Sequence, residues 1–157
     1  MPKVLSSAAV AALYAQQTGQ AFLTLLEVNH DDLAAPIRVV NNIQDVTSGG
    51  HLFLASAFDI NLPDDTTDSP PTITLTICNV DRSITLALES IASPPTVTLW
   101  VVASSTPNTY EIGPIEFTLL ATSYDVLTIE CTLGYEPVLN EPFPGYIFSP
   151  EYFPGLF

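Results

Sequence analysis

The sequence has 157 residues, of which 47% are hydrophobic and 13% are charged, so we expect one folded domain with an ordinary core. Seventeen acidic residues outnumber three cationic ones, Lys3, Arg38 and Arg82, and the formal net charge is −14. Three scattered cations cannot neutralise a run of phosphates, so the composition excludes nucleic-acid binding by charge and argues against an anionic membrane surface as a partner.

The two cysteines, Cys78 and Cys131, are too few for a disulfide framework or a four-ligand zinc site. Both lie in alternating apolar runs, which favours buried free thiols, with one bridge between neighbouring strands as the alternative. No apolar stretch reaches the roughly 18 residues of a membrane span. The segment Met1–Ser7 carries one lysine and lacks an unbroken apolar run, so we interpret it as a mature start made in the cytoplasm.

The N-terminal segment Ser6–Gln17 is predicted to form an amphipathic helix. Its apolar residues recur at helical spacing, and it is rich in alanine. Ser6 or Ser7 is the predicted N-cap, and Gly19 is the predicted stop.

After Gly19, short apolar or alternating segments predict strands. The clearest is Thr72–Cys78, in which threonines alternate with isoleucine and leucine. Turn signals at 48–50 and 123–125 and polar loops at 63–71 and 104–109 separate the segments, and the turn at 123–125 predicts a hairpin. The predicted strands are residues 21–29, 37–41, 51–55, 58–62, 72–78, 96–103, 115–122 and 126–135.

One internal helix is predicted at Arg82–Ser90, with Asp81 as its N-cap and with an apolar stripe formed by Ile84, Leu88 and Ile91. The elements together predict a mainly β fold, an antiparallel sandwich or barrel with an N-terminal helix and one short internal helix. The predicted domain spans residues 1–135.

The last 22 residues, 136–157, are predicted to form a C-terminal docking arm. Five prolines exclude a central strand or a helix interior, and the aromatic side chains carry too much apolar surface to remain in water. Such a segment lies along a groove, either on its own domain or on a neighbour. We expect partial docking on a neighbour, because 22 extended residues reach roughly 70 Å and a domain of this size has a radius of gyration of about 15 Å.

The predicted interface residues are the aromatic side chains of the arm and two small residues of the N-terminal helix, which permit close packing. A helix packed on its own sheet is the alternative for the second group. The residues are Phe143, Tyr146, Phe148, Tyr152, Phe153 and Phe157 in the arm, and Ala8 and Ala12 in the helix.

A catalytic constellation is not apparent, and we predict neither an enzyme nor a cofactor or metal. The histidines, His30 and His51, lie in polar turns. The aspartates Asp64, Asp65 and Asp68 predict an exposed acidic loop, and calcium binding is the alternative. The exposed loop is favoured because the segment lacks the glycine turn and the bidentate glutamate of a calcium loop.

Several stretches match one known family in order along the chain. They are residues 36–42, 58–65, 77–82, 94–99, 117–119 with 123–125, and 141–144 through 153–157. On these stretches the sequence resembles a family of small tail-tip or baseplate proteins of long, non-contractile-tailed bacteriophages, carried as a domain of unknown function. The run Ile77-Cys78-Asn79 departs from the family pattern, which has a polar residue before the asparagine.

The resemblance implies a structural component of the virion that forms or joins a threefold or sixfold ring around the tail channel. The implied partners are other copies of the chain and neighbouring tail proteins, namely the tail tube, hub, tape measure and tail fibres, with assembly in the host cytoplasm. The implied channel passes DNA without binding it, and an acidic wall would serve that purpose. The alternatives are a carbohydrate-binding module of the tail tip, for which Trp100 is the candidate contact, and a cell-wall hydrolase.

Overall fold

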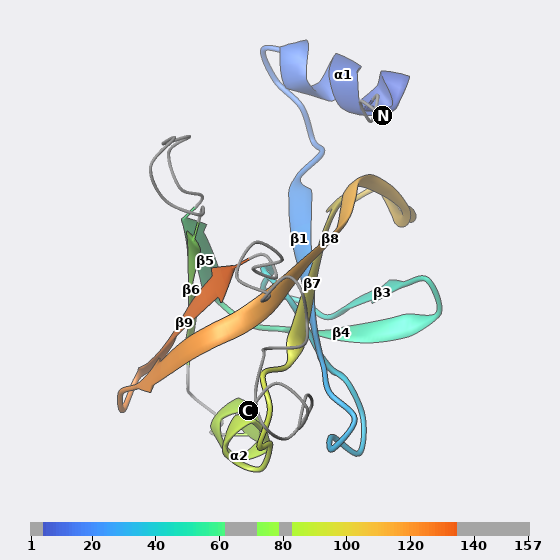
Figure 1. The fold of residues 1–157 in the computed structure, drawn as a ribbon. Helices are drawn as coiled ribbons and strands as arrows, with labels where there is room; N and C mark the ends of the chain where they lie inside the picture. Colours follow the sequence, from blue (N-terminus) through green and yellow to red (C-terminus); the bar gives the residue numbers. More distant parts are fainter. Residues whose placement is uncertain (1–4, 62–71, 79–82, 135–157) are drawn as a thin grey trace, which may run out of the picture.

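The structure is a computed structural model, and it describes residues 5–61, 72–78 and 83–134. The fold is mainly β, with helix α1 (Ser7–Tyr14) ahead of the sheet and a second short helix, α2 (Ser83–Glu89) (Figure 1). The strands are β1 (Phe22–Asn29), β2 (Ile37–Val40), β3 (Val46–Ser48), β4 (His51–Ala55), β5 (Phe58–Asn61), β6 (Thr72–Cys78), β7 (Thr96–Ala103), β8 (Thr106–Tyr124) and β9 (Thr128–Gly134). The predicted fold class is confirmed.

The nine strands form one sheet in the order β3-β4-β2-β1-β7-β8-β9-β6-β5. Their pairings are antiparallel except for β2 with β4, which is parallel. The β1–β7 pair runs without a register shift from Phe22 opposite Ala103 to Asn29 opposite Thr96.

The sheet is buried on both faces around β1 and β7, because successive side chains of a strand point to opposite faces. Leu26 and Val28 of β1 belong to a large core that also contains Phe58 of β5 and Leu88 of α2. Since β1 and β5 lie far apart in the strand order, the sheet curls around this core. On the other face, Leu25 packs in a smaller cluster with Leu23, Val40, Phe53 and Val102.

The β3–β4 hairpin covers the smaller cluster. Phe53 is 3% exposed, and its ring meets Trp100 edge-on with centroids 6.3 Å apart. Trp100 also lies against Tyr110, at a centroid distance of 5.9 Å. At the hairpin tip, the Ser48 hydroxyl donates to the Pro107 carbonyl, and the Gly49 N–H donates to Asn108 Oδ1 at 3.0 Å.

Period-two alternation located β6 correctly, and the apolar run at 21–29 located β1 to within one residue. In β6, residues Ile73, Leu75 and Ile77 are buried, whereas Thr72 and Thr74 are exposed. The stripe of α2 also packs as predicted, with Leu88 buried and Ile84 and Ile91 against the core. The predicted N-cap of this helix, Asp81, lies outside the described residues.

The structure corrects two predicted boundaries and adds one strand. Helix α1 ends at Tyr14, because Ala15 is already extended, and Gly19 does not stop it. Strand β3 was not predicted, since its three residues are too few to show a period. The predicted loop at 104–109 is instead largely part of β8, a strand of 19 residues that pairs with β7 through three register shifts.

Gly113 lies at these register shifts of β8, and its position requires glycine. Its φ is +102°, and a Cβ there would lie 2.5 Å from the Leu99 carbonyl oxygen of β7. The absence of a side chain lets the two strands approach each other.

Candidate functional site

An offset between two neighbouring strands creates the main candidate site. Strand β7 begins at Thr96, which pairs with Thr118 of β8. Strand β8 continues to Tyr124 and pairs there with β9 alone among the described strands. The backbone from Leu120 to Tyr124 therefore has one edge that no described strand covers.

Helix α2 and the residues that follow it form the opposite wall. The loop between α2 and β7 is attached to β8 at its end, where the Leu119 N–H donates to the Pro95 carbonyl at 3.1 Å. Prolines at 94 and 95 exclude a longer β7, because they supply no N–H for a ladder with β8. We call the space between the two walls the β8 groove; it is lined by Leu88, Ile91, Ala92, Ser93, Pro94, Pro95, Leu119, Leu120, Ala121, Thr122 and Tyr124.

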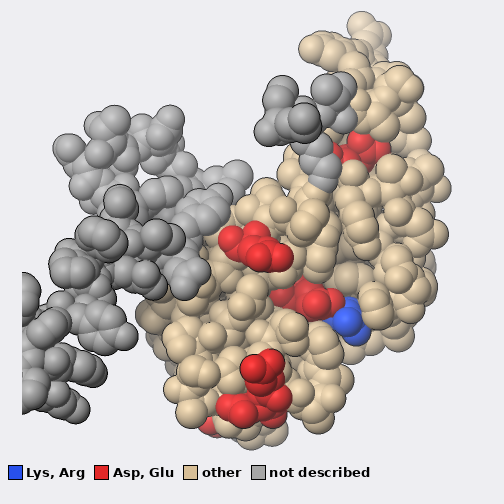
Figure 2. All heavy atoms as spheres, turned by 45° about the vertical axis from the view of Figure 1, so that its right-hand side comes forward, with Lys and Arg blue, Asp and Glu red and all other residues tan. Residues whose placement is uncertain are grey.

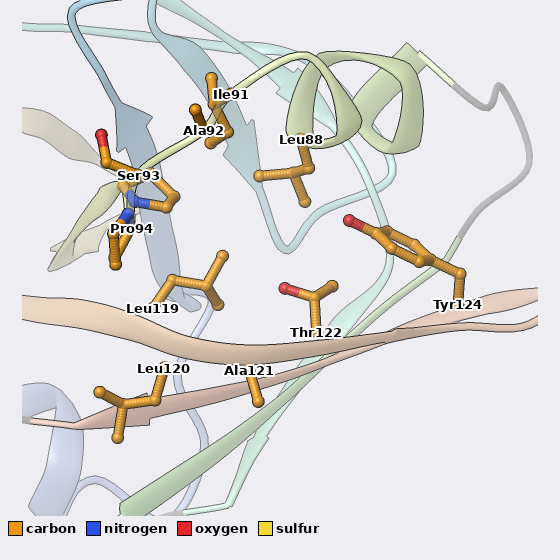
Figure 3. A pocket seen from close by; sticks show the side chains of 11 residues that line it. Leu88, Ile91, Ala92, Ser93, Pro94, Leu119, Leu120, Ala121, Thr122 and Tyr124 are labelled. Carbon is orange, nitrogen blue, oxygen red and sulfur yellow. The ribbon is translucent and has the colours of Figure 1, made fainter.

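The β8 groove has a volume of about 220 Å³, which is below the roughly 300–1,000 Å³ of a typical small-molecule pocket. Figure 3 shows Leu88 on the helix side and Thr122 and Tyr124 on the strand side, all facing the same space. Leu120 and Ala121 point to the other side of β8 (Figure 3). The groove therefore has room for one or two side chains beside the uncovered edge of β8, and its surface mixes polar and apolar atoms.

Tyr124 is the one titratable side chain among the described residues that line the β8 groove. Burial raises the pKa of the Tyr124 phenol, and the proximity of Cys131 and Glu89 adds to this effect. Burial also raises the pKa of the Cys131 thiol to about 11, although a hydrogen bond with Thr122 opposes this shift. Both cysteines are free, with Cys131 buried and Cys78 half-buried. The groove thus offers an uncharged surface and backbone hydrogen-bonding groups.

A second apolar cavity, of about 210 Å³, lies on the inner face of the curled sheet. Its walls come from β1 and β7 on one side and from β5 and β6 on the other, and the lining residues are Thr24, Ile60, Ile73, Leu99, Val101, Phe117 and Leu133. Leu133 directly precedes the last described residue, Gly134.

Helix α1 is attached to β8 through a carboxylate. The Ser6 N–H and hydroxyl donate to the two oxygens of Glu111, at 2.9 and 2.6 Å, while the Ser6 hydroxyl also accepts from the Ala9 N–H as the helix N-cap. The helix lies at the end of the sheet where β1 begins (Figure 1). Ala12 and Ala9 are buried, whereas Ala8 is exposed.

The attachment of α1 is expected to weaken in acid. Hydrogen bonds from the Ser6 hydroxyl and backbone lower the pKa of Glu111 below its ordinary value of 4.5. A lowered pKa contributes stability that is complete above pH 4.5 and is lost as the pH falls through the folded-state pKa. The protection of the α1 amides from hydrogen exchange, measured relative to the intrinsic rate at each pH, should therefore fall below about pH 4.5.

Two glutamine substitutions test this expectation. Glu111→Gln should accelerate exchange of the α1 amides at neutral pH and remove the acid dependence. Glu116→Gln, at an exposed position on the same strand, should change neither. An unaltered acid profile in Glu111→Gln would show that other carboxylates hold the helix.

Positive charge is scarce on the described surface. Arg38 is the only lysine or arginine in the ranges that the structure describes, and its Nε lies 2.6 Å from Glu27 Oε2. Figure 2 shows this single blue side chain against a red one, with other acidic side chains spread over the same face. Within residues 5–61, 72–78 and 83–134, no lysine or arginine other than Arg38 is therefore present to pair with the exposed carboxylates.

His30, in the turn between β1 and β2, makes structural contacts. His30 Nε2 lies 2.6 Å from Ser93 Oγ, and the Asp32 N–H donates to His30 Nδ1 at 3.1 Å. This ring therefore joins the β1–β2 turn to the loop before β7. The described residues contain no cluster of three or more histidine, cysteine, aspartate or glutamate side chains suited to a metal ion. Asp64, Asp65 and Asp68 lie outside those residues.

The predicted arm contacts also lie outside the described residues. They are Phe143, Tyr146, Phe148, Tyr152, Phe153 and Phe157. The sequence prediction missed the β8 groove, although it had placed a helix stripe, two prolines and a strand at the right positions. The groove arises because β8 continues beyond the point where β7 begins. This offset can be recognised only when the register of β7 on β8 is known.

The comparison with protein families decides the affiliation of the chain. The sequence model of a family described as a domain of unknown function, DUF1833, matches residues 8–148. The chain belongs to the DUF1833 family. None of the curated proteins matches it in sequence.

The DUF1833 match extends beyond the predicted domain boundary at residue 135. It includes the first part of the arm, with Phe143, Tyr146 and Phe148, and it ends before Tyr152. In the DUF1833 domain, the arm up to Phe148 is thus part of the sequence that the family shares. Among the described helices, neither is long and apolar enough to cross a membrane.

Proposed function

We propose that this DUF1833 protein is a structural component of a bacteriophage tail tip or baseplate, which forms or joins a ring around the tail channel. The observation that carries the assembly role is the uncovered edge of β8 beside the β8 groove, in a chain whose residues 136–157 are rich in proline and aromatic side chains. The virion location is supported by the resemblance of the sequence stretches given above.

The acidic surface supports a position next to passing DNA. Phosphates are repelled by a wall of like charge, so DNA does not adhere to such a wall. The net charge is −14, and the one described cation, Arg38, is neutralised by Glu27. Solubility alone would also favour an acidic surface, so the charge supports the location only together with the sequence resemblance.

The position of Trp100 weighs against the carbohydrate-binding alternative. Sugar-binding aromatic rings present a free face to solvent. Trp100 is half-buried between Phe53 and Tyr110, within the cluster that holds the β3–β4 hairpin. Its ring serves packing in this fold.

The assembly role is tested by comparing three proteins: the full chain, a chain without residues 137–157, and a full chain with serine at Phe143, Phe148 and Phe153. The mass of each is measured in solution, alone and with the tail proteins encoded beside it. We expect the full chain to form ring-sized complexes and the two variants to remain folded monomers, because aromatic anchors dominate interface energies.

Unfolding of both variants would assign the arm to the core of its own domain and would contradict the proposal. The serine variant keeps the full length of the chain, so it separates loss of the aromatic contacts from loss of the segment itself.

A further inference from the structure

We propose that the β8 groove receives the C-terminal arm of a second copy of the chain as an added β-strand. This inference rests on the assembly role proposed above and names the receiving site. It identifies the uncovered edge of β8, Leu120–Tyr124, as the segment with which the arm pairs.

The backbone edge supplies the first half of the recognition. Leu120–Tyr124 pair with β9 on one side, and on the other side they face the groove. An uncovered strand edge binds an extended peptide through main-chain hydrogen bonds, while neighbouring pockets select its alternate side chains. The five residues of this edge give room for a peptide of similar length.

The arm contains a segment that fits this edge. Gly145–Ser149 is the longest stretch without proline after residue 135, and it has five residues. Proline would remove an N–H from the ladder, so this stretch is best able to pair. In an extended chain Tyr146 and Phe148 point to one side and Ile147 to the other.

The β8 groove accommodates those side chains. Its walls, with Leu88 on one side and Tyr124 on the other, would take the rings of Tyr146 and Phe148, and its polar atoms could meet the Tyr146 hydroxyl. Ile147 would lie over Leu120 and Ala121, which point to the opposite side of β8 (Figure 3). Tyr146 and Phe148 lie within the part of the arm that the family match covers.

The direction of β9 favours a second copy over the same chain as the source of the arm. Strand β9 runs from Ile129, opposite Tyr124, to Gly134, opposite Thr118. The chain therefore leaves the sheet at the Pro95 end of the groove and points away from Leu120–Tyr124. To fill its own groove, the arm would have to cross β8 and reverse its direction. The 23 residues after Gly134 span up to about 75 Å.

Photo-cross-linking in the full-length protein tests the receiving site. The arm carries p-benzoylphenylalanine in place of Phe148, and unlabelled protein is mixed with nitrogen-15-labelled protein before irradiation. We expect cross-linked peptides that join the arm to residues of α2 or of 119–124, with one unlabelled and one labelled partner in about half of the products. Products made only within one copy, or cross-links to the cavity near Ile60 and Ile73, would overturn the proposal.

A steric variant provides the second test. Ala92 is exposed in the wall of the β8 groove, and Ala92→Trp should fill the groove and weaken self-association by roughly tenfold or more in the full chain. Ala35→Trp, at an exposed loop position outside the groove, should leave self-association within about twofold. Equal association constants for the two variants would overturn the proposal.

The two proposals can fail separately. If the serine variant of the arm loses assembly while Ala92→Trp keeps it, the arm binds elsewhere and the assembly role stands. If neither the arm nor the groove affects the mass of the complexes, the assembly role of the arm fails as well.

Discussion

Replacing Gly113 with alanine is expected to lower the free energy of unfolding by about 2–4 kcal/mol. The alanine would have to adopt a φ near +102°, and its Cβ would lie 2.5 Å from the Leu99 carbonyl oxygen. The colliding atom belongs to the backbone of a central strand, so it cannot move aside as a flexible side chain could. Equilibrium denaturation by urea measures the loss directly.

Gly19→Ala is the matched control for this substitution. Gly19 has an ordinary φ, and a Cβ there would meet no atom within 4 Å. The free energy of unfolding of the Gly19→Ala protein should therefore change by less than about 1 kcal/mol, with a small gain because alanine reduces the freedom of the unfolded chain. Equal stability of the two variants would show that β7 and β8 are not pressed together at Gly113.

Phe53→Ala is expected to cost about 3–5 kcal/mol, because it removes the largest buried side chain of the cluster beneath the β3–β4 hairpin. Trp100 is the only tryptophan of the chain and lies against Phe53, so its fluorescence reports on this cluster alone. We expect the emission to shift to longer wavelength, since water would reach the indole. Urea denaturation gives the accompanying loss of stability.

Leu52→Ala is the matched control on the same strand. Leu52 points away from the cluster and is 54% exposed, so its loss should cost less than about 1 kcal/mol and leave the Trp100 emission unchanged. An unchanged emission in Phe53→Ala would contradict the packing of the hairpin on this face of the sheet.

Local pattern was sufficient wherever a strand or helix carries its own periodicity. The alternation of β6 and the stripe of α2 are written in consecutive residues, and both pack as predicted. The first half of β8 contains Pro107, Gly113 and Pro114, which are typical of loops in isolation. Pairing with β7 overrides that local signal through register shifts.

The site depended on information that the sequence pattern does not contain. The β8 groove arises from the register of β7 on β8, and the parallel placement of β4 beside β2 likewise depends on pairings between distant segments. The aromatic composition of the arm predicted a docking segment, which stays a prediction because residues 135–157 lie outside the described residues.

The ion pair between Arg38 and Glu27 has a consequence for how copies of this chain meet. With its one described cation already engaged within the same molecule, the described surface has no lysine or arginine left to attract the carboxylates of a neighbour. Approaching subunits repel each other over a distance set by the Debye length, about 8 Å at physiological ionic strength. Dissolved counter-ions screen this repulsion, so any assembly of the chain is expected to weaken as the ionic strength is lowered.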